Sequence, residues 1–122
     1  MSPLILAVMA PLQTTQTPIE QQLIDMGETA VAVRICEDLE FAALDTSIAE
    51  ARMQALIAQA ETRGISPDQS ATLVETGMDR AIDRISKLHP DLDTPQAQAA
   101  LRKTCMDYVA LHPEEVRPPE AN

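Results

Sequence analysis

From residue 18 onward, apolar side chains recur at three- and four-residue intervals, which is the spacing of one face of an α-helix. The pattern falls into four runs, over residues 18–43, 47–63, 67–88 and 95–111. The most regular run is the third, which carries Ala71, Val74, Met78, Ala81, Ile82, Ile85 and Leu88. Only three glycines occur in the whole chain, so few residues interrupt these runs. The pattern therefore predicts long helices.

Three of the runs begin with a hydroxyl residue followed directly by proline. The hydroxyl suits an N-cap because it accepts a hydrogen bond from a free backbone amide, and proline suits the first helical position because it has no amide to satisfy. The pairs are Thr17-Pro18, Ser66-Pro67 and Thr94-Pro95. Glu20 and Gln69 lie three residues after the first two caps and complete capping boxes.

The boundary between the first two runs is less clearly marked. Ser47 and Glu50 form a fourth possible capping box, which predicts a second helix, whereas a bent continuous helix is the alternative. Gly64 suits the left-handed residue that ends this second helix, and Ile65 then folds back onto the preceding turn.

These elements predict an all-α protein, a small four-helix bundle that becomes a three-helix bundle if the first two helices are continuous. Residues 1–16 are an apolar leader, residues 17–112 the helical domain, and residues 113–122 a disordered tail rich in Pro and Glu. Four helices with wide apolar arcs suit a monomer or a homodimer, and the sequence leaves both open.

The leader resembles the end of a secretory signal. No charged side chain occurs in residues 1–12, and the apolar stretch Leu4–Ala10 is too short to span a membrane. Two features argue against a signal, because no Lys or Arg precedes the stretch and cleavage after Ala10 leaves Pro11 at the new terminus. The alternatives are an apolar N-terminus that packs on the domain and an anchor that lies on a membrane.

The chain has two cysteines, Cys36 in the first predicted helix and Cys105 in the last. Neither belongs to a C-x-x-C motif. Adjacent terminal helices bring the two together, so we predict a disulfide if the protein is exported. The alternative is a pair of buried free thiols in a cytosolic bundle.

The formal net charge is −10, which disfavours nucleic acid as a partner because phosphate backbones are repelled. One basic stripe, formed by Arg80, Arg84 and Lys87, is a candidate contact for an acidic partner. The alternative is an ordinary solvated face, since Asp83 and Lys87 are an i, i+4 pair.

No motif for catalysis, metal binding or cofactor binding occurs in the sequence. His89 and His112 each end a helical run and precede a proline, which favours a helix-terminal role over metal ligation. We therefore expect no catalytic residue, no cofactor and no metal, and a non-enzymatic protein.

The leader, Cys36 on the first helix, the Gly64-Ile65-Ser66 turn and Cys105 on the last helix resemble small bacterial periplasmic helical proteins of unknown function. This resemblance implies a periplasmic or secreted interaction or structural module that contacts another envelope protein. A second resemblance is to acid-activated periplasmic chaperones, which are small, helical and closed by one disulfide, although their cysteine spacing differs. The remaining alternative is a cytoplasmic helical adaptor with free thiols.

Overall fold

A computed structural model describes residues 18–119, and within them it contains four helices and two very short strands. In chain order they are α2 (Ile19–Asp38), β1 (Ala43–Leu44), α3 (Thr46–Glu61), α4 (Pro67–Leu88), α5 (Pro95–Leu111) and β2 (Val116–Arg117). The predicted all-α, four-helix fold is confirmed, and the first two helices are separate. The leader, the cap expected at Thr17 and the last three residues of the tail lie outside the described residues.

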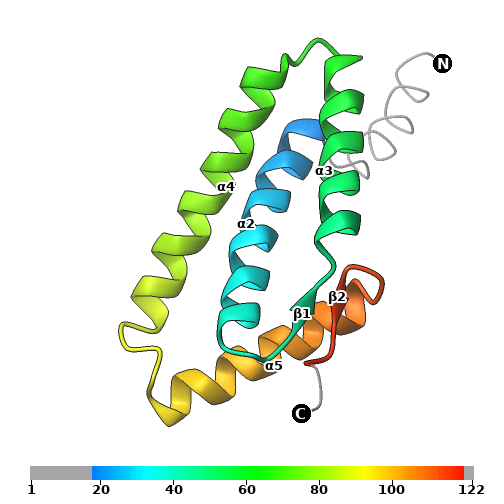
Figure 1. Ribbon diagram of the computed structural model, residues 1–122. Coiled ribbons are helices and arrows are strands. Elements are labelled where there is room, and N and C mark those ends of the chain that lie inside the picture. The colour runs from blue at the N-terminus through cyan, green and yellow to red at the C-terminus, as the bar shows by residue number, and fades with distance from the viewer. Residues whose placement is uncertain (1–17, 120–122) are drawn as a thin grey trace, which may run out of the picture.

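Helix α2 is the central element of the fold. Figure 1 shows α4 running parallel to α2 on one side and α3 running antiparallel to it on the other, while α5 crosses beneath the end where α2 and α4 finish. Helix α2 packs against α3, α4 and α5, and its contact with α4 is the most extensive in the molecule. Each face of α2 therefore has a different partner.

The first helix ends five residues earlier than the sequence predicts, at Asp38 instead of Ala43. Glu40 adopts the left-handed conformation with φ 63°, and the Phe41 N–H donates to the Cys36 carbonyl at 2.8 Å. This is a Schellman-type ending, which normally has glycine where Glu40 stands. Because that glycine is missing, the sequence offers no signal for the break.

Helix α3 is capped by Asp45, and not by Ser47 as the sequence predicts. The Asp45 carboxylate accepts the Ile48 backbone N–H at 3.2 Å and the Ser47 hydroxyl at 2.8 Å. The helix ends as expected, because Gly64 is left-handed with φ 87° and the Ile65 N–H donates to the Ala60 carbonyl at 3.0 Å.

The expected starts of the last two helices are confirmed. At α4, the Ser66 hydroxyl accepts the Gln69 N–H at 3.1 Å, and the Gln69 side chain accepts the Ser66 N–H at 2.9 Å. At α5, the Thr94 hydroxyl accepts the Ala97 N–H at 3.1 Å. Both starts therefore use the side chains that the hydroxyl-proline pairs indicate.

The sequence predicts that the chain is disordered from residue 113 onward, and as far as residue 119 this prediction is wrong. Residues Val116–Arg117 pair antiparallel with Ala43–Leu44, and Val116 is only 1% exposed. Val116 belongs to one of two buried clusters, together with Val33, Cys36, Ala42 and Cys105. We call this cluster, which includes Cys105 of α5, the lower core. A single buried valine among Pro and Glu residues does not change the composition enough to reveal this docking.

Two glycines set the distance between α2 and α4. A Cβ atom on Gly27 would overlap the Val74 carbonyl, and one on Gly77 would overlap the Ile24 carbonyl. The two backbones are therefore in direct contact, which only glycine permits. Glycine is a weak helix former, and nothing in the sequence around Gly27 or Gly77 indicates this packing role.

The buried face of α4 is narrower than the predicted apolar stripe. Its buried residues are Ser70, Val74, Gly77 and Ala81. Met78, Ile82 and Leu88 belong to the predicted stripe but are exposed, Ile82 by 51% and Leu88 by 66%. Close backbone approach brings small residues inside and leaves the large ones at the edge.

Candidate functional site

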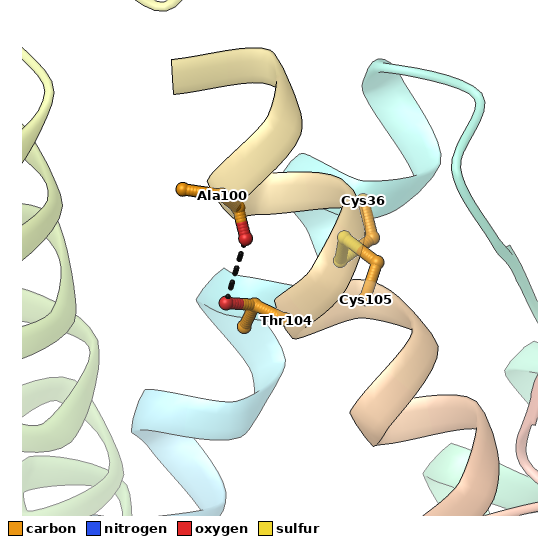
Figure 2. The surroundings of a disulfide bond; sticks show 4 residues. All are labelled: Cys36, Ala100, Thr104 and Cys105. Carbon is orange, nitrogen blue, oxygen red and sulfur yellow. Dashed lines mark hydrogen bonds between the residues drawn. A yellow bond between two sulfur atoms is a disulfide. The ribbon is translucent and has the colours of Figure 1, made fainter. Parts of the chain in front are cut away.

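A disulfide joins Cys36, in the last turn of α2, to Cys105 in the middle of α5 (Figure 2). The Sγ atoms are 2.00 Å apart and the Cα atoms 5.7 Å apart. Both side chains are almost fully buried, so the bond lies inside the lower core and is shielded from solvent. Its place there suits a structural cross-link better than a redox site, because reactive cysteines are partly exposed.

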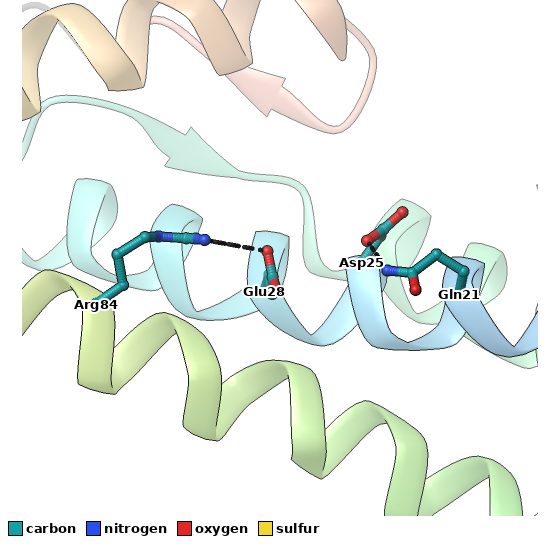
Figure 3. A network of polar contacts seen from close by, with 4 residues as sticks. All are labelled: Gln21, Asp25, Glu28 and Arg84. Atoms are coloured by element: carbon teal, nitrogen blue, oxygen red, sulfur yellow. Dashed lines mark hydrogen bonds and ion pairs between the residues drawn. The ribbon is translucent and has the colours of Figure 1, made fainter.

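The predicted basic stripe is not a continuous cationic surface. Figure 3 shows Arg84 of α4 pointing toward Glu28 of α2. The guanidinium is 3.4 Å from the carboxylate. Lys87 is 3.0 Å from Asp83 one turn back on the same helix. Arg80 is exposed. Since two of the three charges face carboxylates, the stripe is a weak candidate for binding an acidic partner.

The two histidines occupy the helix ends that the sequence assigns to them. His89 follows α4 and His112 follows α5, and their backbone N–H groups donate to Ile85 and Tyr108, each at 2.8 Å. The His112 ring also stacks near Tyr108, with centroids 6.4 Å apart. Within residues 18–119, no group of three His, Cys, Asp or Glu side chains is placed to hold a metal ion.

An open groove of about 880 Å³ lies between α2 and α3. Along α2 its lining includes Gln22, Asp25, Met26, Thr29, Ala30 and Val33. Along α3 it includes Ala49, Arg52, Met53, Ala55, Leu56 and Gln59, and Arg63 lines it from the turn that follows α3. Leu44, His112 and Glu115 close the end nearest the two strands. Its floor is mainly apolar, and we call it the α2–α3 groove.

The groove exists because α3 makes much less contact with α2 than α4 does. Ala60, near the end of α3, is the one residue of that helix that is fully buried. Ala60 packs with Ile19, Leu23 and Val74 in the second buried cluster, which lies at the start of α2 and which we call the upper core. This packing fixes that end of α3. Four of the lining residues, Met26, Ala30, Met53 and Leu56, are apolar positions of the first two predicted helices, but no pattern in the sequence reveals how far apart two helices pack.

Ion pairs hold the C-terminal segment against the lower end of the groove. Arg52 of α3 is 3.3 Å from Glu115 and 3.8 Å from Glu114, and Arg117 is 3.3 Å from Asp45. The hydrogen bond from Ser47, the amide of Ile48 and the charge of Arg117 together lower the pKa of Asp45. Ion pairs from Arg52 and Arg117 therefore connect the C-terminal segment to α3 and its cap.

A second, smaller hollow of about 630 Å³ lies between the residues that follow α2, helix α5 and the residues that follow β2. Its lining includes Leu39, Phe41, Arg102, Met106, Val109 and Pro118. The Arg102 guanidinium covers the Phe41 ring at 4.8 Å from its centroid, so the apolar part of this hollow is already partly capped. The α2–α3 groove is larger and is the better candidate for binding.

No protein-family model, curated protein or solved structure matches this chain. Among residues 18–119, no helix is both long enough and apolar enough to cross a membrane.

Proposed function

We propose that the protein is an exported, non-enzymatic interaction module of the bacterial envelope that binds another envelope protein in the α2–α3 groove. The observation that carries this proposal is the groove itself, a mainly apolar surface between two helices with polar and charged residues among its lining. An apolar helix face or strip of another protein is the ligand that such grooves accept. The likeness to small periplasmic helical proteins points to the same compartment.

The disulfide supports export. Disulfides persist in the periplasm and outside the cell, whereas the cytosol keeps thiols reduced. Cys36 and Cys105 stand 69 positions apart, so their bond closes most of the domain into one loop. The uncharged apolar stretch Leu4–Ala10 supports export independently.

Site-specific photo-crosslinking in cells tests the binding site. A benzophenone amino acid replaces Ala55, an exposed residue that lines the groove, or Arg80, an exposed residue of the basic stripe. We expect a discrete crosslinked envelope protein from position 55 and none from position 80, and binding of that protein again when both are purified. Crosslinks from position 80 alone would move the binding site to the basic stripe.

Two alanine substitutions provide a matched control. Ala30 and Ala58 are both exposed helical residues, but only Ala30 lines the groove. The Ala30→Glu change places a carboxylate on an apolar floor, which disfavours an apolar ligand because the charge must lose water. We expect Ala30→Glu to abolish the crosslink from position 55 and Ala58→Glu to preserve it.

Intact mass tests the compartment. The protein is produced in a bacterium and alkylated in denaturant, before and after reduction. A shortened chain that reacts only after reduction supports export, whereas a full-length chain with two reactive thiols makes the cytoplasmic adaptor the better proposal.

An acid-stress chaperone is the second candidate, favoured by the ion pairs at the lower end of the groove. Protonation of the carboxylates would remove the attraction of Arg52 for Glu115 and of Arg117 for Asp45. The chain would then change from a net charge of −10 to a strongly positive one. If the purified protein does not suppress aggregation of an unfolded client at about pH 3, within the range where carboxyls protonate, this candidate fails.

A further inference from the structure

We infer that the second hollow, between the turn after α2, helix α5 and the residues after β2, binds a small amphipathic carboxylate. The apolar chain of this ligand lies in the hollow, and its carboxylate is bound by the Arg102 guanidinium. The hollow is separate from the α2–α3 groove, so the inference goes beyond the proposed function and does not depend on it.

The shape of the hollow suits a small molecule. Its volume of about 630 Å³ lies within the range of roughly 300–1,000 Å³ that is typical of small-molecule pockets. Leu39, Met106 and Pro118 line it from three different segments. Figure 1 shows the turn after α2 and the end of β2 beside α5. A hollow bounded by three segments accepts a compact ligand, whereas a helix of a partner protein needs an open groove such as that between α2 and α3.

The lining of the hollow is apolar except for two charged side chains. Its apolar members are Leu39, Phe41, Met106, Val109, Pro118 and Pro119, and its charged members are Glu40 and Arg102. Met106 is 64% exposed, so a ligand in the hollow would remove apolar surface from water. Each CH₂ group of the ligand that becomes fully buried should increase the affinity by up to about fourfold.

Arg102 is positioned to bind the carboxylate. Its Cζ atom lies 4.8 Å from the centroid of the Phe41 ring, and this contact restricts the long side chain, so less conformational entropy is lost when a ligand binds. With residues 18–119 the Arg102 side chain makes no hydrogen bond or ion pair, so its N–H donors remain for a ligand. The planar guanidinium matches a carboxylate, which accepts two of these donors at once.

Glu40 is the alternative charge on which a ligand of opposite sign would bind. Its carboxylate is exposed and makes no hydrogen bond or ion pair with the part of the chain that the structure describes. A cationic ligand would have to immobilise this side chain and would be repelled by Arg102, which is already positioned by Phe41. The hollow therefore favours an anion, and the like charge of Glu40 weakens the binding of that anion.

Titration of the isotope-labelled protein with decanoate, followed by amide chemical shifts, tests the inference. Decanol and decylammonium have the same apolar chain with a neutral and a cationic head. We expect saturable decanoate shifts at residues 39–41, 102, 106 and 109, and binding about fivefold tighter than that of decanol, which is the upper range for one exposed ion pair. Shifts confined to the α2–α3 groove, or tighter binding of decylammonium than of decanoate, would overturn the inference.

Two neighbouring substitutions separate the role of Arg102 from the general charge of α5. Arg102→Gln and Lys103→Gln each remove one positive charge from an exposed side chain, but only Arg102 lines the hollow. We expect Arg102→Gln to abolish the preference for decanoate over decanol and Lys103→Gln to preserve it. Equal losses in the two variants would contradict binding by Arg102, because net charge alone would then explain the preference.

Glu40→Gln should have the opposite sign. Removal of this like charge should tighten decanoate binding by up to about fivefold and leave decanol binding unchanged. Weaker decanoate binding in this variant would contradict the assignment of the anion to this hollow.

A third pair of variants tests the apolar part of the site. Met106 and Leu111 are both exposed apolar residues of α5, by 64% and 72%, but only Met106 lines the hollow. Met106→Asp places a carboxylate where the ligand chain lies, so we expect it to abolish decanoate binding, whereas Leu111→Asp should preserve it. Unchanged urea midpoints show that both variants are folded, and decanoate binding that persists in Met106→Asp would overturn the inference.

Discussion

The two sides of α2 are packed in opposite ways. Toward α4, Gly27 and Gly77 bring the backbones into contact, and no space remains even for a methyl group. Toward α3, the helices separate around a groove of about 880 Å³. A close-packed interface has one arrangement and resists substitution, whereas an open apolar one gains free energy when a ligand covers it. The α2–α4 contact therefore maintains the fold, and the α2–α3 groove is the surface available for binding.

The largest expected effect comes from the disulfide, which holds α5 across the end of the α2–α4 pair. Reduction, or the Cys36→Ser and Cys105→Ser double variant, should lower the free energy of unfolding by up to about 4 kcal/mol, because the loop between the cysteines is no longer closed in the unfolded chain. Urea unfolding with and without reductant measures the difference. A loss below about 1 kcal/mol would show that the helices hold α5 without the bond.

The next effect tests the closed side of α2. In an ordinary helix Gly→Ala stabilises by roughly 1 kcal/mol, but Gly77→Ala should destabilise by about 2 kcal/mol or more, because its Cβ would overlap the Ile24 carbonyl. Gly27→Ala should behave in the same way against Val74. Thermal unfolding decides the sign, and a rise in the midpoint for either variant would contradict the close crossing.

A larger side chain on the open side should have little effect on stability. Ala30 is exposed and lines the groove, so Ala30→Leu adds three carbon atoms where there is room. We expect a change within about 0.5 kcal/mol in urea unfolding, although more atoms are added than in Gly77→Ala. A loss comparable to that of Gly77→Ala would mean that the groove is filled or closes in solution.

The smallest effect concerns pH at the lower end of the groove. The pKa of Asp45 is lowered in the folded protein, mainly by the hydrogen bond from Ser47, so its ionised form contributes stability above the unfolded value of about 3.8. That contribution is lost as the pH falls through the folded pKa. Asp45→Asn keeps a good N-cap but cannot ionise.

The Asp45→Asn variant should therefore have a lower urea midpoint than the wild type at pH 6, and the difference should be smaller at pH 2.5, because it declines below the unfolded value of about 3.8 and is lost as the pH falls through the folded pKa. A difference that stays constant between these two pH values would show that the charge of Asp45 has no part in stability.

Local sequence signals predicted the helices well. Ser66 with Gln69, Thr94 with Pro95, and Gly64 with Ile65 act through neighbours a few residues away, and their positions in the fold agree with the prediction. The end of α2 was wrong because Glu40 takes the left-handed position that glycine usually occupies. The cap of α3 was predicted at Ser47 instead of Asp45 because both residues, two positions apart, offer an oxygen that suits an N-cap.

The candidate site depends on distances between helices, which local patterns do not encode. Met26 and Leu56 have the spacing of core residues, yet both line the α2–α3 groove. Gly27 and Gly77 determine the α2–α4 distance, but their pairing is visible only when the two helices are seen together. The pairing of Cys36 with Cys105 is the one long-range contact that the sequence proposed, because only two cysteines were available to form it.

Native-state hydrogen exchange of the protein, with the disulfide intact, tests the difference between the two sides of α2 most directly. Amides of α2 and α4 beside Gly27 and Gly77 should exchange only through global unfolding, while amides in the first half of α3 should exchange through smaller openings of lower free energy. Equal protection along α3 and α4 would contradict the account, because α3 would then be held as tightly as the glycine crossing holds α4.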